Sequence, residues 1–110
     1  MTVLSITPVQ LDTMANAGFL RRVRQFVLDR TINPALRKAA STEAGCYPLW
    51  NSLLPALKGR TEYDQVLRLV YALAAMVTEV DPVTALTASE FDMKQALEDW
   101  GMMRFSEFDL

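Results

Sequence analysis

Residues 62–78, EYDQVLRLVYALAAMVT, are apolar on almost every side of the helix that they predict. A helix that is hydrophobic on most sides lies in the middle of a protein rather than at its surface. Thr61 predicts its start, because the hydroxyl can accept a hydrogen bond from a backbone N–H, and Asp64 places a negative charge where the helix dipole favours one. We therefore expect residues 62–78 to form the central helix of the fold.

Upstream, residues 7–30 form the longest run with one helical signature. Thr7, Pro8 and Gln10 predict its start, since a capping hydroxyl, a proline in the first turn and a capping-box glutamine follow in order. Apolar residues then recur with helical spacing and make one face: Leu11, Ala15, Phe19, Val23, Phe26 and Val27. We expect this helix to pack antiparallel to the central helix and to stay half exposed.

Between these two helices the sequence predicts shorter ones. Asn33 followed by Pro34 is a cap-and-proline start for a short helix over residues 34–41. Composition favours a loop over residues 41–47, with Gly45 as its turning point.

A third segment is expected to open at Pro48. Pro55 predicts a kink in it, because proline cannot donate the helical hydrogen bond, and Gly59 is its natural stop.

After the central helix, Asp81 and Pro82 predict a turn or two of helix. A capping box over residues 87–90 predicts a last helix over residues 91–100, which Gly101 ends. The chain is thus predicted to be all-α, a compact bundle of about five helices in a single domain spanning residues 1–110.

The chemistry that the chain can carry is narrow. It has 110 residues, no histidine and a single cysteine, Cys46, so Ser-His-Asp and Cys-His arrangements and histidine-ligated metals are excluded. The four glycines are scattered, which leaves no phosphate-binding loop. We predict no enzymatic activity, no catalytic residue, no metal and no cofactor, and we expect Cys46 to be a small buried hydrophobic residue.

Residues 1–8 lack the basic and apolar regions of a signal peptide. The apolar run of residues 66–77 is interrupted by Arg68 and is too short to cross a bilayer, which needs about 20 residues. The sequence therefore predicts a soluble, cytoplasmic protein without a membrane partner.

Charge is unevenly distributed along the chain. Residues 1–60 carry a net charge of +5 and residues 61–110 a net charge of −7. Either the two halves attract each other across the fold, or the molecule presents two faces of opposite sign. The net charge of −2 argues against nucleic acid as the principal ligand, because a protein must neutralise phosphates to bind it.

Two groups of residues are candidates for binding a protein partner. Arg21, Arg22 and Arg24 form the densest basic cluster, which is either a solvated helix face or a docking site for an acidic surface. In residues 102–110, Phe105 and Phe108 follow Met102 at intervals of three and alternate with acids. That segment either caps the end of the core or meets a partner.

Two stretches resemble small helical accessory proteins encoded beside type VI secretion spike and effector genes in bacteria. The first match lies in the first helix, at Ile6, Gln10, Leu11, Phe19, Arg21 and Arg22. The second opens the central helix, at Gly59, Thr61, Glu62 and Tyr63. The chain departs from the pattern at Lys58, where the family has tyrosine. The resemblance implies a chaperone-like or adaptor-like role and no catalytic residues.

These observations favour a non-enzymatic protein-interaction module that binds a bacterial secreted effector or its adaptor. Two alternatives remain open. The first is an immunity protein whose acidic half neutralises a toxin by electrostatic complementarity. The second is a structural homodimer that buries its apolar helices between two copies.

Overall fold

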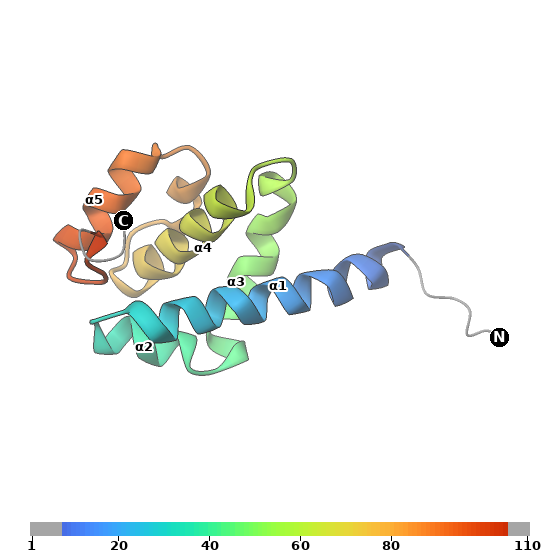
Figure 1. The fold of residues 1–110 in the computed structure, drawn as a ribbon, viewed down its shortest axis with the longest axis horizontal. Coiled ribbons are helices and arrows are strands. Elements are labelled where there is room, and N and C mark those ends of the chain that lie inside the picture. The colour runs from blue at the N-terminus through green and yellow to red at the C-terminus, as the bar shows by residue number, and fades with distance from the viewer. Residues whose placement is uncertain (1–7, 106–110) are drawn as a thin grey trace.

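The computed structural model describes residues 8–105, with side chains from residue 16 onward. This part of the chain is helical and contains no strand, which confirms the all-α prediction (Figure 1). In chain order the elements are α1 (Pro8–Arg30), α2 (Pro34–Ala40), α3 (Glu43–Leu53), η2 (Leu54–Leu57), α4 (Glu62–Val77), η3 (Pro82–Leu86) and α5 (Glu90–Asp99). The η elements are short 3₁₀ helices.

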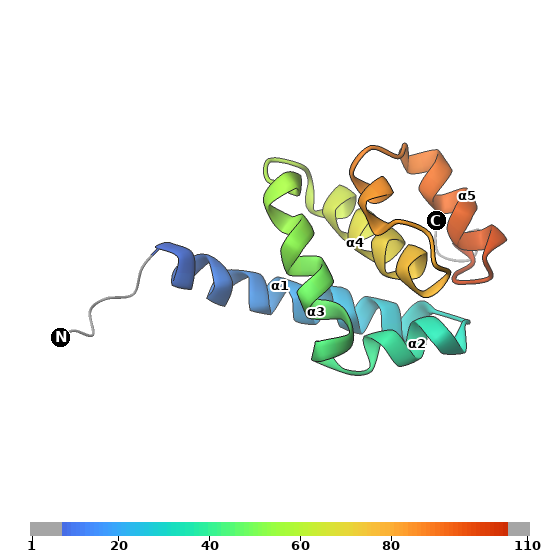
Figure 2. The same cartoon turned by 180° about the vertical axis from the view of Figure 1, so that it is seen from behind.

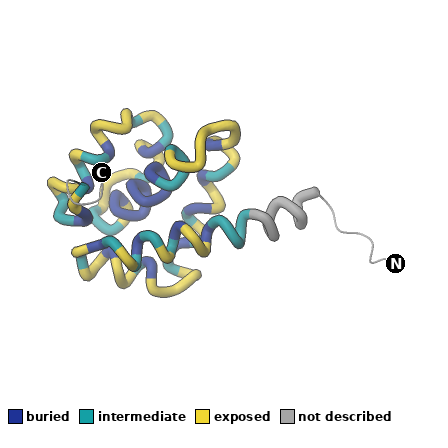
Figure 3. Tube along the Cα trace, in the orientation of Figure 1, coloured by how far each residue is buried: buried dark blue, intermediate teal, exposed yellow. Residues whose placement is uncertain are grey.

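The central position predicted for the apolar helix is confirmed. The nine consecutive residues 67–75 of α4 are all buried, and the other elements surround α4 (Figure 3). Trp50 of α3 is fully buried against it, and its indole N–H donates to the carbonyl of Leu69 at 2.9 Å. This bond satisfies the one polar atom that Trp50 brings into the core.

The prediction that α1 packs against α4 is confirmed, but the antiparallel direction is wrong. Arg22 lies beside Glu62 in the first turn of α4, and Phe26, one turn further along α1, lies near Val66 and Val70. Both helices therefore run in the same general direction (Figures 1 and 2). The reason is that the chain reverses twice between them, once into α2 and once through α3 and η2.

The loop expected over residues 41–47 is also wrong, because α3 begins at Glu43 and contains Pro48. Thr42 caps this helix by accepting from the N–H of Gly45 at 3.1 Å. Gly45 is therefore a helical residue, and it allows close approach, since a Cβ there would overlap the Ala39 carbonyl oxygen.

Local signals elsewhere behave as expected. The Asn33 side chain accepts from two backbone N–H groups at the start of α2, and Thr61 accepts from the N–H of Asp64 at 3.1 Å. The helix breaks at Pro55, where η2 begins with Leu54. The last helix covers Glu90–Asp99, one residue earlier than predicted, and Ser89 rather than Thr87 caps it.

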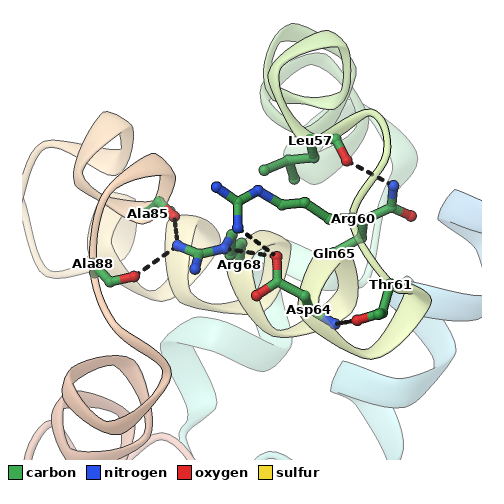
Figure 4. A network of polar contacts seen from close by, with 8 residues as sticks. All are labelled: Leu57, Arg60, Thr61, Asp64, Gln65, Arg68, Ala85 and Ala88. Carbon is green, nitrogen blue, oxygen red and sulfur yellow. Dashed lines mark hydrogen bonds and ion pairs between the residues drawn. The ribbon is translucent and has the colours of Figure 1, made fainter.

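One buried charge joins α4 to the elements that follow it (Figure 4). Arg68 is only 7% exposed. Its Nε donates to an Asp64 carboxylate oxygen at 2.9 Å, and its Nη1 donates to the carbonyls of Ala85 and Ala88 at 2.8 and 2.7 Å. Arg68 thereby pairs its charge and satisfies carbonyls at the end of η3 and in the turn before α5.

Candidate functional site

The three arginines of the basic cluster have different surroundings. Arg24 is engaged inside the chain: its Nε donates to the carbonyl of Ala40 at 2.6 Å, and its Nη2 donates to that of Ser41 at 2.8 Å. These carbonyls lie at the end of α2, where a helix carries partial negative charge. Arg24 therefore caps α2 and is not part of an open basic surface.

Arg21 and Arg22 are both exposed. Arg22 lies 3.6 Å from a carboxylate oxygen of Glu62, and its guanidinium carbon lies 5.6 Å from the centre of the Phe19 ring. Both partners of the Arg22–Glu62 pair are largely exposed, and such pairs contribute little to stability. The pair does link the basic half of the chain to its acidic half.

Phe105 forms one wall of a small apolar pocket of about 60 Å³. The pocket opens at the surface between α1, α4 and the segment that follows α5. Its lining residues are Phe26 of α1, Tyr63, Val66, Leu67 and Val70 of α4, and Phe105. We call it the aromatic pocket.

Cations lie near each of the three rings of the aromatic pocket. The Arg30 guanidinium carbon is 4.6 Å from the centre of the Phe26 ring. Lys94 of α5 places its ammonium 5.5 Å from the centre of the Tyr63 ring and 5.7 Å from that of Phe105. Cations at these distances are attracted by the negative ring faces. Arg30 and Lys94 thus lie against the rings of the pocket, whose lining is apolar.

Carboxylates hold these rim groups in place. Glu90 lies 3.3 Å from the Lys94 ammonium and accepts from the Tyr63 hydroxyl at 3.4 Å. Glu98 accepts from the backbone N–H of Phe105 at 2.9 Å. The rings of Tyr63 and Phe105 are therefore anchored through α5 as well as through their own backbone.

Of the five residues predicted to bind a partner, Phe105 lines the aromatic pocket, Arg22 pairs with Glu62 away from its lining, and Arg21 is exposed. Arg24 is turned to α2, and Phe108 lies outside the described residues. Sequence reasoning missed Phe26 and Tyr63 as site residues. Residues 63, 66 and 70 have the spacing of one helix face, which indicates that they lie together. Spacing alone does not show whether such an apolar face lines a surface pocket or packs in the core.

Cys46 is fully buried, as expected, and its Sγ–H donates to the Thr42 carbonyl at 3.4 Å. Burial raises the pKa of the Cys46 thiol from 9.0 to about 11. At neutral pH the thiol is therefore protonated and a poor nucleophile. Within residues 8–105, no group of three or more histidine, cysteine, aspartate or glutamate residues is placed to hold a metal ion.

Comparison of the chain with protein-family models, curated proteins and solved structures gave no match. The resemblance to type VI secretion accessory proteins therefore stays a prediction. In the part of the chain that the structure describes, none of the helices combines the length and the apolar character needed to cross a membrane.

Proposed function

We propose that this chain is a non-enzymatic protein-interaction module and that its aromatic pocket receives an apolar side chain of a protein partner. The observation that carries the proposal is the meeting of Phe26, Tyr63 and Phe105 around one apolar pocket at the surface. These residues come from three separate parts of the sequence, and the fold brings them together.

The composition of the aromatic pocket suits this use. Binding energy at protein interfaces concentrates in a few aromatic and arginine residues around small pockets that an anchor side chain fills. Tyr63 is 53% exposed, so its ring is accessible to a partner. Arg30 and Lys94 lie against the rings, and Glu90 pairs with Lys94 at 3.3 Å, so the surroundings of the pocket carry charges of both signs.

The resemblance of the first helix and of the start of α4 to type VI secretion accessory proteins suggests the identity of the partner. We propose a secreted effector or its adaptor, which this chain binds and stabilises before delivery. Co-expression with the products of neighbouring genes would supply the candidate partner, and improved solubility or secretion of that partner would support a chaperone role.

The test uses two exposed aromatic residues. Tyr63→Ala removes one wall of the pocket, and Phe91→Ala is the matched control, because Phe91 is 72% exposed and does not line the pocket. We expect Tyr63→Ala to weaken partner binding about tenfold or more and Phe91→Ala to leave it unchanged. Wild-type affinity in Tyr63→Ala would rule out the pocket as the binding site.

A second candidate, an immunity protein, is favoured by the exposed acids of α5: Glu90, Asp92, Glu98 and Asp99. An acidic surface speeds encounter with a basic toxin cleft. Rescue of cells from a co-expressed toxin would support this function. The substitutions Asp92→Lys and Asp99→Lys should then slow association with the toxin at low salt, whereas stabilisation of an effector through the pocket should be unaffected.

Light scattering at micromolar concentration tests the remaining alternative, the homodimer, which a purely monomeric mass would rule out.

A further inference from the structure

The size and the lining of the aromatic pocket limit the side chains that it can hold. We propose that the pocket selects the aliphatic end of a leucine or methionine side chain over aromatic and polar side chains, and that Val66 sets this size limit. The inference rests on the proposed function in taking the pocket as the partner site, and it names the chemical class of the partner's anchor residue.

The volume of the pocket restricts its occupant to a small group. The pocket encloses about 60 Å³. An apolar cavity of about 150 Å³ holds one molecule of benzene, so about 60 Å³ corresponds to roughly two or three carbon-sized groups. The isopropyl end of leucine and the thioether end of methionine have this size. A phenyl ring is larger and would stand mostly outside the pocket.

The lining of the pocket excludes polar groups. Among the lining residues, Tyr63 carries the only polar side-chain atom, and its hydroxyl already donates to Glu90 at 3.4 Å. The backbone N–H of Phe105 donates to Glu98 at 2.9 Å. A hydroxyl, an amide or an indole N–H brought into the pocket would lose its hydrogen bonds to water against an apolar lining. The occupant is therefore apolar throughout the part that enters.

The charges near the pocket favour an uncharged anchor. Glu62, the neighbour of Tyr63 in the chain, lies 3.6 Å from the Arg22 guanidinium, and Glu90 lies 3.3 Å from the Lys94 ammonium. A charged anchor would compete with these ion pairs, whereas a neutral one leaves them intact. Electrostatic complementarity thus agrees with the volume and the lining.

The rings of the pocket suit both side chains. Phe26, Tyr63 and Phe105 present aromatic carbon to the occupant. Aliphatic groups gain dispersion contacts against such walls, and a methionine sulfur makes favourable contacts with aromatic rings. Leucine and methionine therefore share the chemistry that the pocket requires, which is a small, apolar and uncharged end.

Val66 is the lining residue that can best be changed to test the size limit. It is partly buried, whereas Leu67 and Val70, which also line the pocket, are buried in the core. Val66→Ala removes two methyl groups and enlarges the pocket toward the size that a ring needs. Val66→Phe adds a ring and fills the pocket.

The experiment uses small probes on the full chain. These are the N-acetyl amides of leucine, methionine, phenylalanine and tyrosine, with the glycine amide as the control that lacks a side chain. NMR follows the methyl resonances of Leu67 and Val70 in the pocket and of Leu36 in the core away from it. We expect the leucine and methionine amides to shift the pocket resonances at about tenfold lower concentration than the two aromatic amides do. The Leu36 resonances should stay in place.

The Val66 variants should change this order of preference. Val66→Ala should bring the phenylalanine amide to about the affinity of the leucine amide, and Val66→Phe should abolish the shifts by every amide. Val83→Ala is the matched control, because Val83 is exposed and does not line the pocket. Far-UV circular dichroism confirms that each variant is folded, and the comparison of probes on the wild type needs no variant.

Tighter or equal binding of the phenylalanine amide to the wild type would overturn the inference. Pocket resonances that no amide shifts more than the glycine amide does would overturn it too, and an unchanged preference in Val66→Ala would remove the role of Val66. These failures are distinguishable from failure of the proposed function. Weaker partner binding by Tyr63→Ala would still support the pocket as the partner site, whatever anchor enters it.

Discussion

Arg24 and Arg37 cap each other's helices. Arg24 of α1 donates to the carbonyls of Ala40 and Ser41 at the end of α2. Arg37 of α2 donates to the carbonyls of Leu28 and Thr31 at the end of α1, at 2.9 and 2.8 Å. Each guanidinium bridges two carbonyls that a helix end leaves unpaired, so the two arginines fasten α1 and α2 together.

This relationship predicts that replacing either Arg24 or Arg37 by alanine lowers the free energy of unfolding by about 1–2 kcal/mol, because charged donors to the helix ends are lost. Lysine should not restore it, since an ammonium lacks the planar fork that bridges two carbonyls. Urea unfolding measures the effect, with Lys38→Ala, an exposed neighbour on α2, as the control. Equal stability of the Arg37→Ala and Lys38→Ala variants would contradict it.

The buried contacts of Arg68 predict a larger loss of stability when this residue is replaced. Arg68→Met should lower the free energy of unfolding by about 3 kcal/mol, because the Asp64 carboxylate loses its buried partner and the Ala85 and Ala88 carbonyls lose their donor. Hydrogen exchange should also accelerate most in residues 82–90, which Arg68 ties to α4. The matched control is Arg60→Met, because Arg60 pairs with the same carboxylate from an exposed position.

Two glycines predict opposite responses to the same substitution. Gly18 lies in α1, and apart from its chain neighbours and the backbone of its own helix no heavy atom lies within 4 Å of the position that a Cβ would take, so Gly18→Ala should stabilise the protein by about 0.5–1 kcal/mol. Gly45→Ala should destabilise it, because the new Cβ would overlap the Ala39 carbonyl oxygen. Thermal unfolding of both variants checks the prediction, and a lower melting temperature for Gly18→Ala would contradict it.

Cys46 predicts a pH dependence of stability. Because burial raises the pKa of the folded thiol from 9.0 to about 11, the folded state holds this proton more tightly than the unfolded state does. The resulting stabilisation is fully present below pH 9 and is lost as the pH rises from about 9 to about 11.

The check is urea unfolding at several pH values across this range. The free energy of unfolding should fall more steeply with pH for the wild type than for Cys46→Ala, in which all other titrating groups, including Tyr47, are retained. Parallel pH profiles would refute the assignment. Alkylation of the folded protein at pH 8 should be slow and should accelerate in urea, because the buried thiol is exposed only on unfolding.

Much of the fold could be predicted because it depends on neighbours in the sequence. The caps at Asn33, Thr61 and Asp81, and the break at Pro55, act over one turn of chain, and the structure contains each of them. The loop predicted around Gly45 is wrong, because the helical spacing of apolar residues there outweighs the loop-like composition.

Cys46, Trp50 and Leu53 are spaced by four and three residues, and all three are buried on one face of α3. Their burial outweighs the missing hydrogen bond of Pro48, which lies within the same helix. The spacing of these three residues is the signal in the sequence that indicates a helix over residues 43–53.

The sequence by itself determined that this chain is helical, that residues 62–77 are its core and that histidine-dependent chemistry is absent, because periodicity and composition are local properties. Tertiary structure alone decided that α1 and α4 run in the same direction and that Arg24 turns to α2. It also decided that Phe26, Tyr63 and Phe105 surround one pocket. These relationships depend on contacts between residues far apart in the chain, whose free energies are settled only when the helices pack.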